Sequence, residues 1–134
     1  MGMQPSGAFR ILGIQVKQFD FKQVGELLSL KYAKIKLGYS IKACAEKIDN
    51  NYILVVWTNL TAKQKENDVF YIKSTIMGKI AVQDGFQQEA LKNMTAIIYS
   101  YLRPLVAQMT TMSKLPPIDL PPANFEDFEV ELKE

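Results

Sequence analysis

The feature that most constrains the fold is a segment in which apolar and polar side chains alternate one by one. Residues 32–46, YAKIKLGYSIKACAE, follow this pattern. A period of two places the two sets of side chains on opposite faces of a β-strand. The apolar set consists of Ile35, Leu37, Tyr39, Ile41, Ala43 and Ala45. One face of this strand is therefore expected to contact a core, and the other to face solvent.

Three more segments predict strands around this one. Residues 9–21 and 69–82 approximate the same two-residue period. Residues 52–60, YILVVWTNL, are apolar on both faces, which predicts a central strand. Residues 49–51 supply a turn before it, and residues 62–68 supply a polar loop after it. The prediction is a four-stranded antiparallel meander.

A long helical pattern follows the strands, from about residue 86 to about residue 112. Its apolar residues recur at spacings of three and four, which is typical of an amphipathic helix. They are Leu91, Met94, Ile98, Leu102, Leu105 and Met109. Pro104 removes one backbone hydrogen bond inside this helix, which predicts a kink near Tyr101. Strands followed by a helix predict an α+β domain with the helix packed on one face of the sheet.

The C-terminal quarter contains an unusual apolar segment, KLPPIDLPPANFEDF, with four of the six prolines of the chain. Proline keeps a backbone extended, so residues 114–123 are expected to form a connecting segment. A short final helix is predicted over residues 125–134, because acidic residues stand in its first turn. The length of 134 residues fits a single domain over residues 1–134, with residues 1–8 expected to be flexible.

The composition excludes several classes of function. The chain has no histidine and a single cysteine, Cys44. Ser-His-Asp and Cys-His catalysis, histidine-based metal sites and an intramolecular disulfide are therefore excluded. Asp20, Glu46, Asp84 and Glu89 could serve as an acid or base, but no two of them stand at an informative spacing. We expect neither enzymatic activity nor a cofactor.

Charge and hydropathy favour neither a nucleic-acid-binding nor a membrane-inserted protein. The formal net charge is +2, from 16 basic and 14 acidic residues. Five lysines cluster around the second predicted strand, namely Lys31, Lys34, Lys36, Lys42 and Lys47. We interpret them as a solvated face that prevents edge-to-edge aggregation, because no aromatic platform alternates with them. Neither a signal peptide nor a long apolar run is present, so the predicted location is the cytoplasm.

Aromatic side chains exceed what one helix can cover from one side of a sheet. The residues concerned are Tyr32, Tyr39, Tyr52, Trp57, Phe70 and Tyr71. Association of subunits would bury the remainder, so we expect an oligomer.

The order of elements and the C-terminal quarter resemble the SecB-like chaperone family, which comprises the bacterial protein-export chaperone and its relatives. The most specific match is LPPIDLPPANFEDF at residues 115–128, and YLRP at 101–104 stands where the family has Tyr-x-Arg in its main helix. Residues 9–21 resemble the first strand of the family, and residues 69–82 resemble its last long strand with a glycine near the middle. The resemblance implies a cytoplasmic homotetramer, a dimer of dimers, that binds unfolded polypeptides for export or for protection of a dedicated client.

The resemblance also implies where clients bind, because the proline-rich segment and the last helix line hydrophobic grooves in this family. The matching client-binding residues are Leu115, Ile118, Leu120, Phe125 and Phe128. Proline would stiffen such a surface and so lower the entropic cost of binding. The alternative is that these side chains simply cover the sheet or the helix as part of the core.

One departure from the family concerns its partner in export. Export chaperones of this family carry acidic residues on the sheet that dock the translocase motor, and the matching positions here are Gln18, Lys22 and Lys73. Lysines would repel a basic partner, so we expect no standard docking of the motor. Two alternatives therefore stay open: a chaperone associated with a toxin–antitoxin pair, and a structural or phage-encoded homo-oligomer without chaperone activity.

Overall fold

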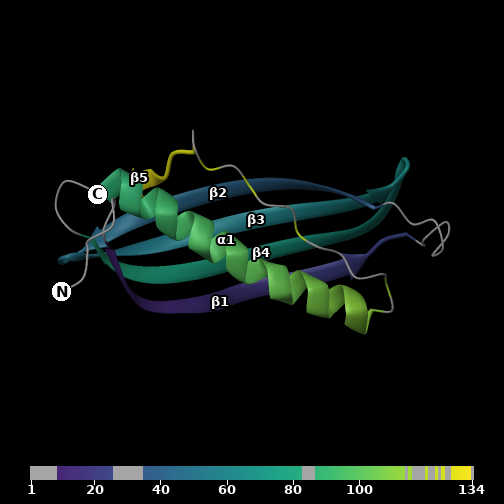
Figure 1. Cartoon of the computed structure of the whole chain (residues 1–134), viewed down its shortest axis with the longest axis horizontal. Coiled ribbons are helices and arrows are strands. Elements are labelled where there is room, and N and C mark those ends of the chain that lie inside the picture. Colours follow the sequence, from purple (N-terminus) through teal and green to yellow (C-terminus); the bar gives the residue numbers. More distant parts are fainter. Residues whose placement is uncertain are drawn as a thin grey trace, which may run out of the picture.

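One sheet and one long helix make up the described part of the chain (Figure 1). The computed structural model describes residues 9–25, 35–82, 87–113, 115, 120, 123, 125 and 128–133. The elements are β1 (Phe9–Gln23), β2 (Lys36–Ile48), β3 (Asn51–Gln64), β4 (Asn67–Val82), α1 (Gln87–Met112) and β5 (Glu131–Lys133). The prediction of four antiparallel strands followed by a long helix is confirmed. Residues 1–8, which were expected to be flexible, and the prolines of residues 114–123 lie outside the described residues.

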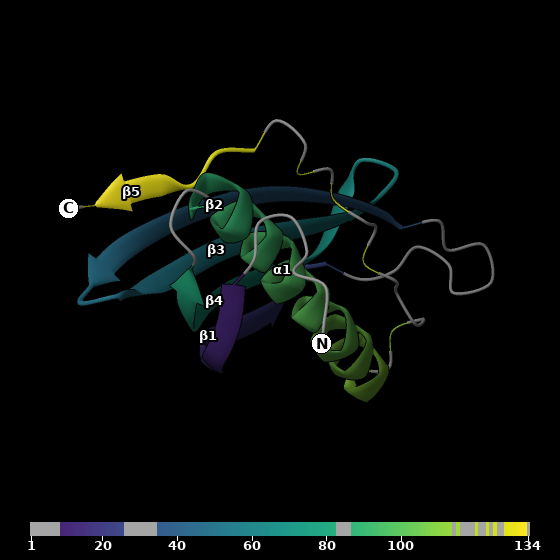
Figure 2. The same cartoon turned by 60° about the vertical axis from the view of Figure 1, so that its left-hand side comes forward.

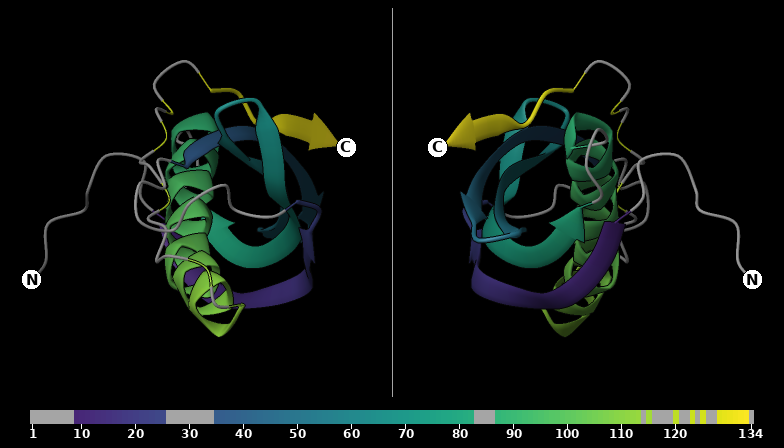
Figure 3. Two further views of the ribbon diagram at one scale, coloured as in Figure 1. Left: turned by 90° about the vertical axis from the view of Figure 1, so that its right-hand side faces the viewer. Right: turned by 90° about the vertical axis from the view of Figure 1, so that its left-hand side faces the viewer.

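The strand order in the sheet is β1-β4-β3-β2-β5. β2, β3 and β4 form the predicted meander, and β3 is central as its apolar character indicated. The predicted meander is wrong for β1, which does not pair with β2 but lies beside β4, at the edge of the sheet opposite β5. Contacts distant in sequence decide this placement, among them the packing of Phe21 of β1 on Phe70 of β4, with ring centroids 5.2 Å apart. Figure 3 shows that the strands bend strongly, with α1 to one side of them.

The hairpin between β3 and β4 is tighter than the sequence predicts. Residues 62–68 were expected to form a loop, but the two strands continue through Gln64 and Asn67, leaving only Lys65 and Glu66 between them. Lys65 has a φ of 57°, in the left-handed region that a tight turn uses. The two strands continue into this polar stretch because its residues still pair between β3 and β4. Lys63 lies opposite Asp68, with Nζ and Oδ1 3.7 Å apart.

The core lies between α1 and one face of the sheet. Alternate residues of β3 and β4 point toward the helix, which presents its own apolar stripe to them. The largest enclosed side chains are Phe70, Leu54, Leu60, Ile72, Ile76, Ile80, Leu91, Met94, Ile98, Leu102, Leu120 and Val56. Leu105 and Met109 of the predicted stripe are half-buried, and Val106 is buried between them. α1 is one helix through Pro104, which lies on its exposed side.

The predicted final helix is wrong for the described residues at the end of the chain. Glu131–Lys133 form β5, which pairs in parallel with β2 through Cys44, Ala45 and Glu46 (Figure 2). β2 would otherwise present unpaired backbone N–H and C=O groups along this edge. Val130 is buried in the core and brings the end of the chain to that edge. A nearby strand edge thus overrides the local helical signal.

Side chains of α1 pack directly on Gly78 of β4. A Cβ atom at this position would lie 2.8 Å from Cε of Met94 and 3.2 Å from Cδ1 of Ile98. We therefore predict that Gly78→Val lowers the free energy of unfolding by about 1–3 kcal/mol, because the side chain overfills the interface. Urea denaturation followed by circular dichroism measures this loss.

Gly38→Val is the matched control, because a Cβ at Gly38 of β2 has nothing within 4 Å. Its free energy of unfolding should stay within about 0.5 kcal/mol of the wild type. If Gly78→Val and Gly38→Val changed the free energy of unfolding equally, the packing of α1 on β4 would tolerate a larger side chain, and a glycine at position 78 would not be required.

Candidate functional site

The C-terminal segment folds back along α1 and is held at several described points. The Leu115 N–H donates to the Thr110 carbonyl at 2.9 Å, where α1 ends. Arg103 Nε donates to the Leu120 carbonyl at 3.2 Å. Further on, Gln88 Nε2 donates to the Val130 carbonyl at 3.1 Å. The helix residues that hold the segment have lower and lower numbers as the numbers in the segment rise, so the segment runs antiparallel to α1.

The structure separates the predicted client-binding residues into two kinds. Leu115 and Leu120 are 7% and 2% exposed and belong to the core, so in this conformation they present no surface to a foreign chain. Phe125 and Phe128 are half-buried against that core. Ile118 lies outside the described residues. Client contact by any of the five stays a prediction.

Four aromatic side chains connect β2, α1 and the C-terminal segment. Tyr39 packs on Tyr99 with ring centroids 5.8 Å apart, Tyr99 packs on Phe125 at 5.8 Å, and Phe125 packs on Phe128 at 5.4 Å. The last two pairs are edge-to-face, a favourable arrangement worth about 0.5–1.5 kcal/mol per pair beyond area burial. We call these four residues the aromatic row. It fastens the segment to the domain while part of its surface stays open.

The two tyrosines of the aromatic row have opposite exposures. Tyr39 is 42% exposed, whereas Tyr99 is buried. Burial raises the pKa of the Tyr99 hydroxyl to about 12, with a smaller contribution in the same direction from Tyr39 and an opposing one from Arg103. The sequence predictions did not include these tyrosines in the site. Two features of the sequence could have indicated them. Tyr39 stands on the apolar face of its predicted strand, and Tyr99 stands next to Ile98 of the apolar helical stripe.

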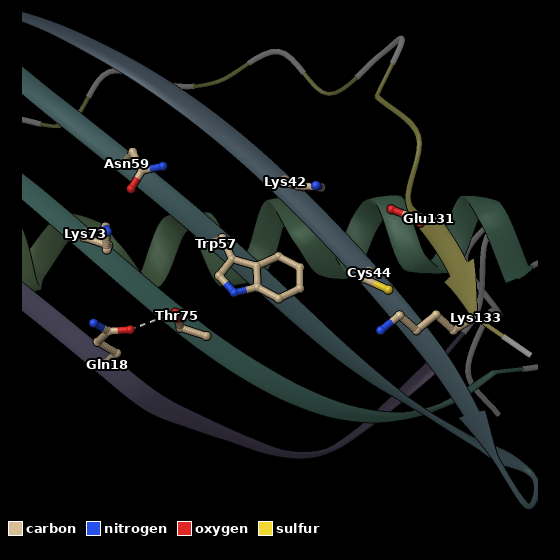
Figure 4. A pocket seen from close by; sticks show the side chains of 9 residues that line it. All are labelled: Gln18, Lys42, Cys44, Trp57, Asn59, Lys73, Thr75, Glu131 and Lys133. Atoms are coloured by element: carbon tan, nitrogen blue, oxygen red, sulfur yellow. Dashed lines mark hydrogen bonds between the residues drawn. The ribbon is translucent and has the colours of Figure 1, made fainter.

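The other face of the sheet, away from α1, carries polar and charged side chains. We call it the open face. Lys42 of β2, Trp57 of β3, Thr75 of β4 and Gln18 of β1 form one row of cross-strand neighbours on it (Figure 4). Thr75 Oγ1 donates to Gln18 Oε1 at 3.5 Å. These side chains line part of a pocket of about 570 Å³.

Gln18, Lys22 and Lys73, the positions that the resemblance matched to acidic docking residues, all lie on the open face. Gln18 and Lys73 line its pocket, and Lys22 is the cross-strand neighbour of the exposed Tyr71. The structure thus brings together positions that are far apart in the sequence. The charge there comes from lysines, as the sequence indicated.

Neither a metal cluster nor a membrane span is found among the described residues. No group of three or more histidine, cysteine, aspartate or glutamate side chains in this part of the chain could hold a metal ion. α1 lacks the continuous apolar length needed to cross a bilayer.

The architecture is that of SecB-like proteins: four antiparallel strands, a long helix across them and a C-terminal segment folded back over both. The chain belongs to the SecB family, whose family model, described as preprotein translocase subunit SecB, matches residues 3–132. Proteins of this family are chaperones in protein export and are not enzymes.

Relatives in sequence and in structure agree with this assignment. The protein-export protein SecB of Acinetobacter baumannii is 23% identical over 126 residues, which cover 90% of this chain and 83% of that protein. The SecB-like chaperone Rv1957 of Mycobacterium tuberculosis, solved with a ChAD peptide from the HigA1 antitoxin, superposes with a TM-score of 0.69 at 14% identity, covering 84% of this chain and 89% of that one. A Streptococcus agalactiae protein of unknown function gives a TM-score of 0.55 at 14% identity, covering 84% of this chain and 96% of that one.

Leu120 provides a direct test of whether the segment is held by the core. We predict that Leu120→Ala lowers the free energy of unfolding by about 2–4 kcal/mol, because the side chain is enclosed and its loss leaves a cavity. Leu132→Ala on β5 is the control, since Leu132 is exposed, and should cost less than about 1 kcal/mol. Denaturation curves compare the two. A Leu120 variant as stable as the wild type would mean that the segment is not packed on the domain.

Tyr99 predicts a dependence of stability on alkaline pH. Its folded pKa lies above its ordinary value of 10.0, so the unfolded chain loses the proton first as the pH rises. The stabilisation is complete below pH 10.0 and is lost as the pH rises toward about 12. Tyr99→Phe removes this group, so its free energy of unfolding should fall less steeply over that range than that of the wild type.

Denaturation at several pH values across this window measures the effect, and Tyr101→Phe on the exposed side of α1 is the control. Identical slopes for wild type and Tyr99→Phe would contradict the assignment.

Proposed function

We propose that this chain is a holding chaperone that binds non-native polypeptides through the open part of the aromatic row and keeps them from aggregating in the cytoplasm. The observation that carries the proposal is the position of Tyr39, Phe125 and Phe128, which remain partly exposed where strand, helix and segment meet. Membership of the SecB family supports the same activity.

Rigidity makes this surface suitable for binding. Tyr99 is buried and contacts both Tyr39 and Phe125, while Leu120 and Val130 hold the segment on either side. The exposed rings therefore need little further ordering when a client binds. Aromatic side chains also offer a large apolar area with few rotatable bonds, so a client that exposes apolar residues gains affinity at low entropic cost.

We also propose that the chain assembles as a homotetramer, a dimer of dimers. β1 forms an outer edge of the sheet, and Ile11, Leu12 and Val16 on it are exposed. Tyr101 and Met112 of α1 are exposed as well. Apolar side chains and an unpaired strand edge favour association with another copy. This surface differs from the aromatic row, so assembly and client binding are separable.

Coupling to a translocase motor through carboxylates on the sheet is not part of the proposal. Gln18, Lys22 and Lys73 supply no negative charge on the open face, so a basic partner would be repelled there.

A second candidate function is protection of one dedicated client, such as an antitoxin. The supporting observation is the fold similarity to Rv1957, which was solved with an antitoxin peptide. A general chaperone suppresses the aggregation of unrelated polypeptides, whereas a dedicated one acts on its own partner alone.

The first test mixes the purified chain with a chemically unfolded polypeptide and records light scattering together with native mass. We expect suppression at stoichiometric amounts by a tetramer. Phe128→Ser should weaken client binding roughly tenfold, because truncation of an aromatic residue at the centre of an interface typically costs more than about 1 kcal/mol of binding free energy. Phe125→Ser combined with Phe128→Ser should abolish suppression. Circular dichroism and native mass check that each variant keeps its fold and assembly.

Ile48→Ser is the matched control, because it removes an exposed apolar side chain at the hairpin between β2 and β3, away from the aromatic row. It should suppress aggregation like the wild type. A tetramer that binds no unfolded chain would contradict the proposal and favour a structural oligomer. Equal losses in Ile48→Ser and Phe128→Ser would place the client elsewhere.

A further inference from the structure

The pocket on the open face combines positive charge with one aromatic surface (Figure 4). It has a volume of about 570 Å³ and is lined by residues of all five strands. They are Gln18, Lys42, Cys44, Trp57, Asn59, Lys73, Thr75, Glu131 and Lys133. Figure 4 shows them on the side of the sheet opposite α1, so the pocket is separate from the core.

The charge of this pocket is not balanced from within. Lys42, Lys73 and Lys133 contribute three positive charges against the single carboxylate of Glu131. Within the described residues, none of these lysines forms an ion pair, since the pairs found there join Lys63 to Asp68 and Lys92 to Glu89.

Two other carboxylates are cross-strand neighbours of pocket lysines: Asp20 lies beside Lys73, and Glu46 lies beside Lys133. Neither forms an ion pair with its lysine within the described residues, and Asp20 accepts a hydrogen bond from Gln18 Nε2 instead. The ammonium groups of Lys42 and Lys73 therefore stay available to an external anion, while Lys133 lies beside Glu46.

Trp57 occupies the middle of the lining. It is the single tryptophan of the chain and is 39% exposed, with Lys42 and Thr75 as its neighbours on the adjacent strands. Figure 4 shows lysines on both sides of its indole ring. Asn59 and Gln18 add amide groups that can donate and accept hydrogen bonds. The pocket thus offers cations, an apolar ring and neutral polar groups within one small area.

We propose that this pocket binds a short, extended, acidic segment of a partner polypeptide. Carboxylates of the segment contact Lys42, Lys73 and Lys133, an apolar side chain covers Trp57, and backbone amides reach Asn59 and Gln18. Lys42 and Lys73 are two strands and two residues apart, or roughly 12 Å from strand and residue spacings. An extended chain covers this distance in about three to four residues, so carboxylates at that interval match the lysines.

The chemistry favours a peptide over a nucleic acid. Single-stranded nucleic acids stack successive bases on several aromatic side chains, whereas this lining contains one ring. Glu131 also repels a continuous phosphate backbone, while a peptide can present a neutral or basic residue to it. This inference is independent of client binding, because no residue of the aromatic row lines the pocket.

Trp57 allows binding to be observed directly by fluorescence. The probe is a ten-residue peptide with aspartate at every third position and leucine and serine between, compared with the same peptide carrying asparagine for aspartate. We expect a saturable change in Trp57 emission with the acidic peptide and none with the asparagine peptide. Affinity should fall as ionic strength rises from about 0.01 M to about 0.15 M, because the Debye length shortens from about 30 Å to about 8 Å.

Charge reversal locates the site. Lys42→Glu and Lys73→Glu should each weaken binding roughly tenfold, since each replaces an attraction by a repulsion. Lys36→Glu is the matched control: Lys36 is an exposed lysine of the same strand, about 20 Å from Lys42 by residue spacing. It should change the affinity less than about twofold. Calorimetry repeats the comparison without relying on fluorescence.

Three results would overturn this inference: equal binding of the asparagine peptide, an effect of Lys36→Glu as large as that of Lys73→Glu, or tighter binding of a single-stranded oligonucleotide than of the acidic peptide. Suppression of aggregation is measured on the same variants and should be unchanged. Failure to suppress aggregation by a protein that still binds the acidic peptide would contradict the proposed chaperone function alone. Failure to bind the acidic peptide by a protein that still suppresses aggregation would contradict the proposed pocket alone.

Discussion

The packing of α1 on one face of the sheet is the interaction on which the rest of the structure depends. Its apolar stripe, from Leu91 to Val106, encloses the inward side chains of β3 and β4, and Gly78 allows the helix to come close. The same helix carries Gln88, Tyr99 and Arg103, the residues that hold the C-terminal segment. One packed interface therefore provides both the core and the support of the candidate site.

This arrangement gives the two faces of the sheet different chemistry. On the helix side, burial leaves Phe125, Phe128 and Tyr39 as a partly open aromatic surface, suited to apolar polypeptide segments. On the open face, lysines lie around Trp57, where we propose that an acidic segment binds. A chaperone with two such faces can hold a client on one and contact a partner on the other, because the sheet keeps the two surfaces apart.

Part of the candidate site was predictable from the sequence, and part was not. Phe125 and Phe128 stand in a proline-rich segment whose apolar character was evident, and both reach the domain surface. Leu115 and Leu120 have the same local pattern but are core residues. Arg103 holds the Leu120 carbonyl, and both leucines join a core whose other members come from the helix and the sheet, which are distant in sequence. Tyr39 and Tyr99 were missed for a related reason: each belongs to a regular apolar pattern, and only the packing of strand against helix makes them neighbours.

The amino-acid sequence by itself determined the strands, the long helix and the α+β class, because periods of two and of three to four residues express the local geometry of strand and helix. It also determined that the three positions matched to acidic residues of the family carry no negative charge, because Lys22 and Lys73 are basic and Gln18 is neutral. Only the tertiary structure decided that β1 lies beside β4, that the end of the chain forms β5 on the edge of β2, and that the lysines surround Trp57. Strand order and edge pairing depend on contacts between distant residues, which no local pattern encodes.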